Sequence, residues 1–323
     1  MPQNNEVMLL QILFIILGVV LVLWGADRLT EGASSLARRM NVPEMVIGLT
    51  IVAAGTSAPE LFVSVVSALK GTPDLAVGNV VGSNIMNTLL IVGVTAMVAP
   101  MVISKNTVAK DIPFTVIASL LLMVLCLDTF SSFSISGNMI SRIDGVIMLL
   151  AFAVFMYYTF RMTKGQQVEA VADSTPVWKG ALWVIVGLVC LVVGSNVFVD
   201  NASAFARGLN VSDSIIGLTI VAGGTSLPEL ATSVVAARKG QSAIAIGNVI
   251  GSNVFNILMI LGLTGVISPM QIGGITLIDL GMMLLSMLVV WLFCFTRYTV
   301  ARWEGALLTL GYVAYTAWLV ANV

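Results

Sequence analysis

Two glutamates, Glu60 and Glu229, lie about midway along long apolar segments of the 323-residue chain. Both end the same six-residue pattern, Gly-Thr-Ser-x-Pro-Glu, over 55–60 and 224–229. A charged side chain at membrane depth costs roughly 2.5–3.5 kcal/mol on insertion scales and marks a functional site by default. The alternative is a pair of protonated acids that only hold helices together, and it is disfavoured because the surrounding residues suit cations.

The proline before each glutamate predicts a broken or bulged helix. Pro59 has no N–H, so the carbonyl group of Gly55 loses its helical partner. Pro228 has the same effect in the second pattern. Unpaired carbonyl groups persist at membrane depth only where they are buried in protein or line a watery cavity. We therefore expect inward-facing carbonyl groups in this stretch, including those of Ala53 and Ala222.

Hydroxyl side chains share a helix face with each glutamate. Thr56 and Ser57 precede the first glutamate by four and three residues, so their oxygens can meet its carboxylate. Thr225 and Ser226 stand in the same relation to the second glutamate. Each carboxylate is thus predicted to have hydroxyl neighbours on its own helix.

The apolar segment after each glutamate carries a second motif, GNVVGSNIMN in the first case and GNVIGSNVFN in the second. Its small-xxx-small spacing favours close helix packing. Ser83 and Asn87 are four residues apart and share a face, as do Ser252 and Asn256. The remaining asparagines are interpreted first as interhelical hydrogen-bond residues and second as ligands: Asn79, Asn84, Asn248 and Asn253.

These candidate ligands supply only oxygen atoms. The chain contains no His, which excludes imidazole metal sites and Ser-His-Asp triads. Hard oxygen ligands suit Ca²⁺ and also Na⁺, whereas Mg²⁺ prefers to keep its waters. Two glutamates carry at most two negative charges, which one Ca²⁺ or two or three Na⁺ can neutralise. A buried site that must be filled by either ion before it closes is typical of an exchanger. No enzyme activity and no cofactor are expected.

Composition places these motifs in a membrane. Apolar residues make up 58% of the chain, charged residues 10%, and the mean hydropathy is +1.03. Such a chain cannot cover a globule with a wetted surface, so a soluble enzyme and a disordered chain are excluded. The net charge of −1 gives no reason to expect nucleic acid. We predict an all-α integral membrane protein whose ten transmembrane helices cover 8–26, 45–69, 75–99, 112–128, 143–161, 180–200, 214–237, 243–268, 275–296 and 304–321.

The sequence also repeats itself at an offset of 169 residues. Between 47–93 and 216–262, 30 of 47 positions are identical. The predicted halves are a first five-helix repeat at 1–161 (core 46–93), a linker at 162–179, and a second repeat at 180–323 (core 215–262). Because five spans are an odd number, the second copy must enter the membrane from the opposite face. Two inverted repeats with a site near the midplane are typical of secondary transporters.

Positive residues indicate the orientation. Twelve of the 15 Lys and Arg residues fall in the loops after odd-numbered predicted spans. The positive-inside rule then puts both termini outside and the 162–179 linker in the cytoplasm. We expect a multi-pass protein of the plasma or inner membrane that works as a monomer in the lipid bilayer.

At these motifs the sequence resembles the cation/calcium exchanger superfamily, in its sodium/calcium exchanger branch of the prokaryotic, potassium-independent type. The resemblance covers nearly the whole chain. It implies four clustered cation sites in a diamond, one for Ca²⁺ and the others tied to Na⁺, with a sliding bundle formed by the first and sixth spans. The residues it implicates are Glu60 and Glu229 as central bidentate ligands, the carbonyl groups of Thr56 and Thr225 in the Ca²⁺ shell, Ser57, Ser226, Ser83 and Ser252 with the carbonyl groups of Ala53 and Ala222 at flanking Na⁺ sites, and Asn87 and Asn256 as the middle pair.

One residue departs from part of that family. Some members carry Asp where this chain has Asn256, so here both middle residues are amides. The missing carboxylate argues against K⁺ co-transport, and the family's exchange of three Na⁺ for one Ca²⁺ would be electrogenic. The proton/calcium branch ranks second, because it tends to have an acidic residue after Gly-Asn, where Val80 and Val249 stand here. A cation channel and a membrane scaffold or sensor are alternatives from other classes.

Overall fold

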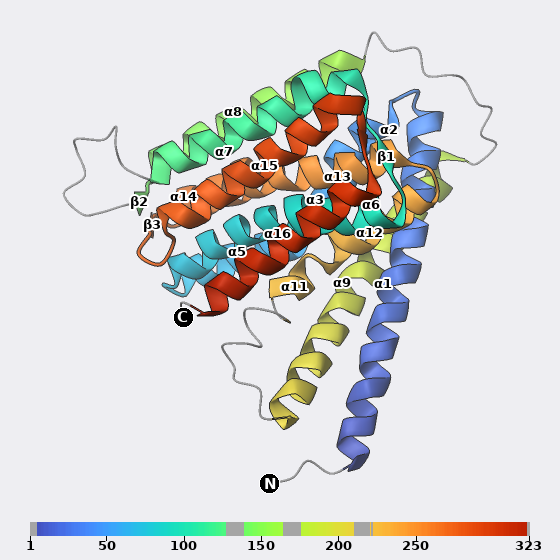
Figure 1. Cartoon of the computed structure of the whole chain (residues 1–323), viewed down its shortest axis with the longest axis vertical. Helices are drawn as coiled ribbons and strands as arrows, with labels where there is room; N and C mark the ends of the chain where they lie inside the picture. The colour runs from blue at the N-terminus through green and yellow to red at the C-terminus, as the bar shows by residue number, and fades with distance from the viewer. Residues whose placement is uncertain (1–4, 127–138, 164–175, 210–219, 221, 322–323) are drawn as a thin grey trace.

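The computed structural model describes residues 5–126, 139–163, 176–209, 220 and 222–321. Among them, eight helices are long and apolar enough to cross a membrane, and a bent pair, Glu44–Thr56 with Ala58–Leu69, adds a ninth. The fold is therefore that of a mostly helical, multi-pass membrane protein (Figure 1). The predicted span 214–237 begins in residues outside the described part of the chain. Most of the 162–179 linker also lies outside it.

The first half contains α1 (Asn5–Arg39), α2 (Glu44–Ile47), η1 (Gly48–Val52), α3 (Ala53–Thr56), α4 (Ala58–Leu69), α5 (Pro73–Ile85), η2 (Met86–Ile91), α6 (Val92–Val98), η3 (Thr107–Asp111), α7 (Ile112–Cys126) and α8 (Arg142–Thr163). The second half contains α9 (Val177–Gly208), α11 (Ala222–Thr225), α12 (Leu227–Arg238), α13 (Ser242–Val254), η5 (Phe255–Ile260), α14 (Leu261–Ile267), α15 (Leu277–Arg297) and α16 (Arg302–Ala321). Helices labelled η are π-helical turns.

Helix α1 continues well past residue 26, where the predicted span ended. The predicted end rested on the charged residues Asp27 and Arg28, and both charges are satisfied within the fold. Arg28 pairs with Asp27 at 2.5 Å and with Glu31 at 2.9 Å. Its guanidinium also lies over the rings of Trp24 and Trp183, at 5.9 and 5.1 Å from their centroids. Helix α9 likewise extends beyond its predicted range of 180–200.

Helices α1 and α9 lie side by side and project beyond the other helices (Figure 1). Glycines allow their backbones to touch. A Cβ atom at Gly25 would lie 2.8 Å from the carbonyl oxygen of Gly187, and one at Gly18 would lie 2.8 Å from that of Gly194. No Cβ fits at these distances, so the two helices pack as one close unit.

Two buried segments cross the centre of the molecule, α5–η2–α6 and α13–η5–α14. Each changes from an α-helix to a π-helical turn where the second motif ends. Asn87 lies in η2 and Asn256 lies in η5. A π-bulge widens the helix locally and is frequent at functional sites. The predicted middle pair is therefore located on irregular backbone.

Among the described residues, four strands of two residues each accompany the helices of this mostly helical fold. Strand β1 (Met101–Val102) pairs with β4 (Thr299–Val300), and β2 (Met139–Ile140) pairs with β3 (Met270–Gln271), both antiparallel. Each ladder joins a connection of the first half to one of the second half. These segments are extended because backbone groups just beyond a helix end need partners, and each strand supplies them to the other.

Candidate cation site

Both glutamates lie just after a break in a helix. Ser57 and Ser226 have non-helical backbone angles, with ψ of 7° and 8°. The prolines occupy the first turn of the following helices, α4 and α12. In the first half the two helix axes differ by 46°. The predicted break at each Gly-Thr-Ser-x-Pro-Glu pattern is thus confirmed, and it places a glutamate in the first turn of each helix after the break.

One detail of the predicted backbone is wrong in this conformation. The carbonyl oxygen of Ala53 is not free, because it accepts a hydrogen bond from the N–H of Ser57 at 3.0 Å. It also accepts one from the hydroxyl of Thr56 at 3.3 Å. The backbone before Ser57 therefore keeps a helical hydrogen bond in a stretch where the proline was expected to leave carbonyl groups unpaired. The role of this carbonyl as a Na⁺ ligand stays a prediction, and so does that of the Ala222 carbonyl.

Serines link the two glutamates crosswise. Ser57 donates to the Oε1 atom of Glu229 at 3.1 Å, and Ser226 donates to the Oε1 atom of Glu60 at 3.2 Å. The serine that precedes one glutamate in sequence therefore binds the other glutamate in space. Both carboxylates are completely buried. The two broken helices thus meet face to face at their breaks.

The second motif brings another serine to each carboxylate. Ser83 donates to the Oε1 atom of Glu60 at 3.4 Å, and Ser252 donates to that of Glu229 at 3.5 Å. The hydroxyl oxygen of Ser226 also lies 3.3 Å from that of Ser83. Six of the predicted ligands therefore form two hydrogen-bonded groups, one around each glutamate, which together make up the acid cluster. All the donors in it are neutral hydroxyls, so they do not compensate the charge of two carboxylates.

Four buried oxygen atoms in this region have no hydrogen-bond partner among the described residues. They are Oε2 of Glu60, Oε2 of Glu229, Oδ1 of Asn87 and Oδ1 of Asn256. All four side chains are at most 1% exposed. A buried acceptor without a partner is costly, and a cluster of them calls for an explanation such as an ion. Each of the four central residues that the sequence singled out supplies one of these atoms.

The glutamate backbones are held by asparagines. Asn79 donates to the carbonyl oxygen of Glu60 at 3.2 Å and to Ser64 at 3.0 Å. Asn248 makes the equivalent bonds, to the carbonyl oxygen of Glu229 at 3.2 Å and to the hydroxyl of Ser233 at 3.0 Å. The interpretation of these asparagines as interhelical hydrogen-bond residues is confirmed.

The two threonines of the glutamate patterns have different surroundings. Thr56 is completely buried, and its hydroxyl lies 3.0 Å from Oδ1 of Asn248 and 3.5 Å from the hydroxyl of Ser252. Thr225 is half-buried. Asn79 is also half-buried, whereas its counterpart Asn248 is fully buried. Among the described residues, those on the Thr56 side of the cluster are therefore more deeply buried than those on the Thr225 side.

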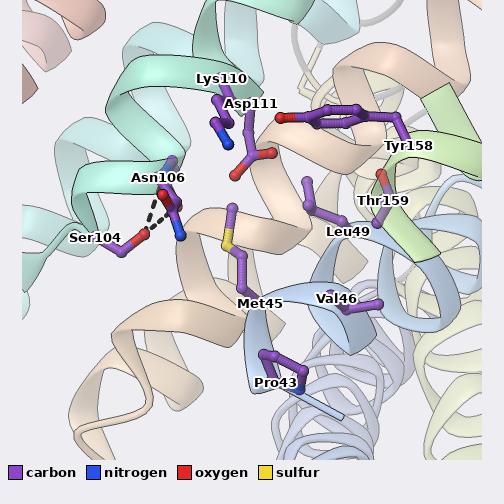
Figure 2. Close-up of a pocket in the computed structure, with 11 residues that line it drawn as sticks. Pro43, Met45, Val46, Leu49, Ser104, Asn106, Lys110, Asp111, Tyr158 and Thr159 are labelled. Atoms are coloured by element: carbon purple, nitrogen blue, oxygen red, sulfur yellow. Dashed lines mark hydrogen bonds between the residues drawn. The ribbon is translucent and has the colours of Figure 1, made fainter. Parts of the chain in front are cut away.

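Figure 2 shows a separate cavity of about 60 Å³ away from this cluster. It lies between the start of the second predicted span, the turn around η3, and the end of α8. Asp111 and Tyr158 face each other across it (Figure 2). None of the twelve predicted ligand residues lines it. The acid cluster is therefore recognised by its unpartnered oxygens.

Comparisons with known proteins agree with this description. The model of the sodium/calcium exchanger protein family matches residues 10–161 and 179–321. A putative antiporter, CaxA, from Alkalimonas amylolytica is 39% identical over 81% of this chain and 82% of its own length. The inner membrane protein YrbG of Escherichia coli is 36% identical over 97% of each chain. A solved structure of the sodium-calcium exchanger NCX_Mj, soaked without Na⁺ and Ca²⁺, has a TM-score of 0.83 and 31% identity, over 97% of this chain and 99% of that one.

Proposed function

The chain belongs to the sodium/calcium exchanger family, and we propose that it is a secondary active antiporter that exchanges Ca²⁺ for Na⁺ across the membrane by alternating access. The ions bind near the midplane, between the two halves. Glu60 and Glu229 provide the charge, and the ligands predicted from the sequence complete the sites. Ca²⁺ and Na⁺ are the transported substrates.

One observation carries this proposal: the four unpartnered buried oxygens of Glu60, Glu229, Asn87 and Asn256. They combine two carboxylates with two neutral amide oxygens, a donor set that suits hard cations. Among the described residues, no three His, Cys, Asp or Glu side chains gather into a metal-binding group, so hydroxyl and amide oxygens must complete any shell. Soft transition metals are disfavoured by the same donor set.

The charge of the site explains why transport would be an exchange. Two buried carboxylates without a compensating charge strongly destabilise a closed, dry site. One Ca²⁺ neutralises both, and so do two or more Na⁺ bound at neighbouring positions. An empty site resists closure, so the protein changes conformation only when loaded with one ion or the other. Uncoupled leak is suppressed for the same reason.

Reciprocal contacts support an inverted repeat as the basis of alternating access. Gly18 packs on Gly194 while Gly25 packs on Gly187, and the 169-residue offset exchanges these two pairs. The same offset relates the two serine–glutamate bonds to each other. In this proposal 1–161 and 180–323 are the two repeats, with 162–179 as a cytoplasmic linker and both termini outside. Each repeat contributes five of ten spans, and the protein works as a monomer.

In that orientation the uneven burial of the two sides of the cluster supports an outward-facing state. The more deeply buried Thr56 side of the cluster is nearer the cytoplasm, and the more exposed Thr225 side is nearer the exterior. On the cytoplasmic side, the Lys239 ammonium pairs with the Asp27 carboxylate at 2.6 Å and so ties the end of α12 to α1. At the offset of 169, the corresponding residues are Lys70 and Asn196, which cannot form an ion pair.

We therefore expect Asp27→Asn to shift the protein toward the inward-facing state. The side chains of this pair are about one-third exposed. Because exposed ion pairs contribute about 0.2–1 kcal/mol, the ratio of the two states should change by roughly 1.4- to 5-fold. Pulsed electron paramagnetic resonance between spin labels on α1 and α12 would measure the ratio. Lys239→Arg keeps the charge and should leave it unchanged; equal ratios for Asp27→Asn and wild type would contradict the role of the pair.

The transport proposal is tested by uptake of radioactive calcium into proteoliposomes. Vesicles loaded with Na⁺ and diluted into Na⁺-free buffer should take up Ca²⁺, whereas vesicles loaded with choline should not. Replacing choline by K⁺ should change nothing, because both middle residues are amides. Uptake driven by a proton gradient but not by Na⁺ would instead favour a proton/calcium exchanger of the same fold. Uptake that needs no ion on the opposite side, together with single-channel currents, would favour a channel.

A further inference from the structure

The middle pair of amides raises a problem of orientation. A carboxamide group has an oxygen end and an NH₂ end of almost the same size, and only the oxygen end binds a cation. Within the part of the chain that the structure describes, Oδ1 of both Asn87 and Asn256 is buried without a partner, while both NH₂ groups donate hydrogen bonds. Something must hold the amides this way round, because the reverse orientation would point hydrogens at the cation.

The Asn256 amide is held through Asn84. Its Nδ2 atom donates to Oδ1 of Asn84 at 3.0 Å. The other end of the Asn84 amide donates to the backbone carbonyl oxygen of Asn253 at 3.4 Å. A backbone carbonyl can only accept, so Asn84 must present its NH₂ group there and its oxygen to Asn256. Asn256 then has to turn its own oxygen toward the site.

The Asn87 amide is held by a second relay. Its Nδ2 atom donates to Oδ1 of Asn253 at 3.0 Å, and Nδ2 of Asn253 donates to the hydroxyl of Thr88 at 3.0 Å. The hydroxyl of Thr88 has one proton, which it donates to the carbonyl oxygen of Asn84 at 2.7 Å. Thr88 can therefore only accept from Asn253, and this fixes the direction of both amides.

We propose that Asn84 and Asn253 are positioning residues of the cation site, which lock the amides of Asn256 and Asn87 with their oxygens facing the ion. The inference rests on the proposed function, since it assumes that a cation occupies the site. Both side chains are at most 2% exposed, so water does not compete for these hydrogen bonds. The Asn84 role differs from packing alone, because it depends on residue 256 being an amide.

The test compares Asn84→Leu in two backgrounds. Leu has a similar size but cannot accept a hydrogen bond, so the Asn256 amide is free to turn and the half-saturating Ca²⁺ concentration should rise about tenfold or more. In the Asn256→Asp background both terminal oxygens are acceptors, so orientation no longer matters and the same substitution should cost less than about threefold. Binding is read from Ca²⁺- and Na⁺-dependent shifts of the unfolding temperature in detergent.

A second pair of variants changes the structure less and tests the proposal even if Asn84→Leu does not fold. Thr88→Val removes the acceptor of the second relay and should also weaken Ca²⁺ binding severalfold. Thr264→Val is the matched control, because Thr264 is equally buried but its hydroxyl donates only to the carbonyl oxygen of Ile260 in its own helix. This control should leave the binding of Ca²⁺ and Na⁺ unchanged.

The outcomes separate the two levels of the proposal. If wild type binds Ca²⁺ and Asn84→Leu costs the same in both backgrounds, Asn84 serves packing only, and the positioning role is overturned while the proposed function stands. Equal effects of Thr88→Val and Thr264→Val would overturn the second relay. If neither Ca²⁺ nor Na⁺ shifts the unfolding temperature of wild type, the proposed function is wrong and the positioning role is lost with it.

Discussion

Glu229→Gln and Glu60→Gln should each abolish Ca²⁺ uptake into Na⁺-loaded proteoliposomes. Each variant removes one of the two negative charges and turns one ligand oxygen into an NH₂ group that repels the cation. The serine partners, Ser57 and Ser226, keep an oxygen to donate to, so the helices can still pack. Removing one partner of a buried charge pair costs about 3–5 kcal/mol. We therefore expect a loss of at least about 100-fold in uptake rate at limiting Ca²⁺.

Glu304→Gln provides the control for this pair. Glu304 is also a buried glutamate at 5% exposure, but its Oε2 atom accepts from the N–H of Ala301 at 2.7 Å and so caps α16, away from the cluster. Its replacement should lower stability modestly and leave the affinity for Ca²⁺ intact. Similar, mild losses in all three variants would show that the central acids do not bind the ion, and the transport mechanism would have to be abandoned.

The sequence was sufficient to predict which two buried acids lie at the centre of the candidate site. Duplication of the two motifs singled out Glu60 and Glu229. Helix periodicity, by contrast, assigned Ser57 to Glu60 and Ser226 to Glu229, and the crosswise hydrogen bonds show that this assignment is wrong. Pro59 and Pro228 correctly predicted helix breaks. The proline prediction succeeds because it depends on local chemistry: a proline removes a donor wherever it stands. The helix-face prediction fails because the helix is interrupted at Ser57 and Ser226.

The sequence could not predict contacts that depend on how the halves meet. Nothing local indicates that Ser57 binds Glu229 rather than the glutamate three residues after it. Thr88 gave no signal either, because its counterpart in the repeat is Ile257. The length of α1 was missed because Asp27 and Arg28 looked like a helix end, whereas Lys239 from a distant helix satisfies the carboxylate. Such partners are fixed only by packing of the whole chain.

Gly187→Ala should destabilise the protein severely, although it adds one methyl group. A Cβ atom at position 187 would lie 2.6 Å from the backbone N of Leu29 and 2.7 Å from the carbonyl oxygen of Gly25. Both are backbone atoms of α1, so no side chain can turn away to make room. Overpacking costs about 1–3 kcal/mol where the core can adjust, and we expect at least about 2 kcal/mol here. The measurement is thermal unfolding in detergent.

Gly311→Ala makes the same change of residue type, but we expect it to raise the stability of the protein rather than lower it. Gly311 is exposed on α16, and among the described residues no atom lies within 4 Å of its Cβ position. Alanine favours a helix over glycine by up to about 1 kcal/mol, so this variant should be slightly more stable than wild type. If both variants were stabilised alike, α1 and α9 would have room between them. The two helices could then move independently of each other, and the idea that they move as one unit during transport would lose its structural basis.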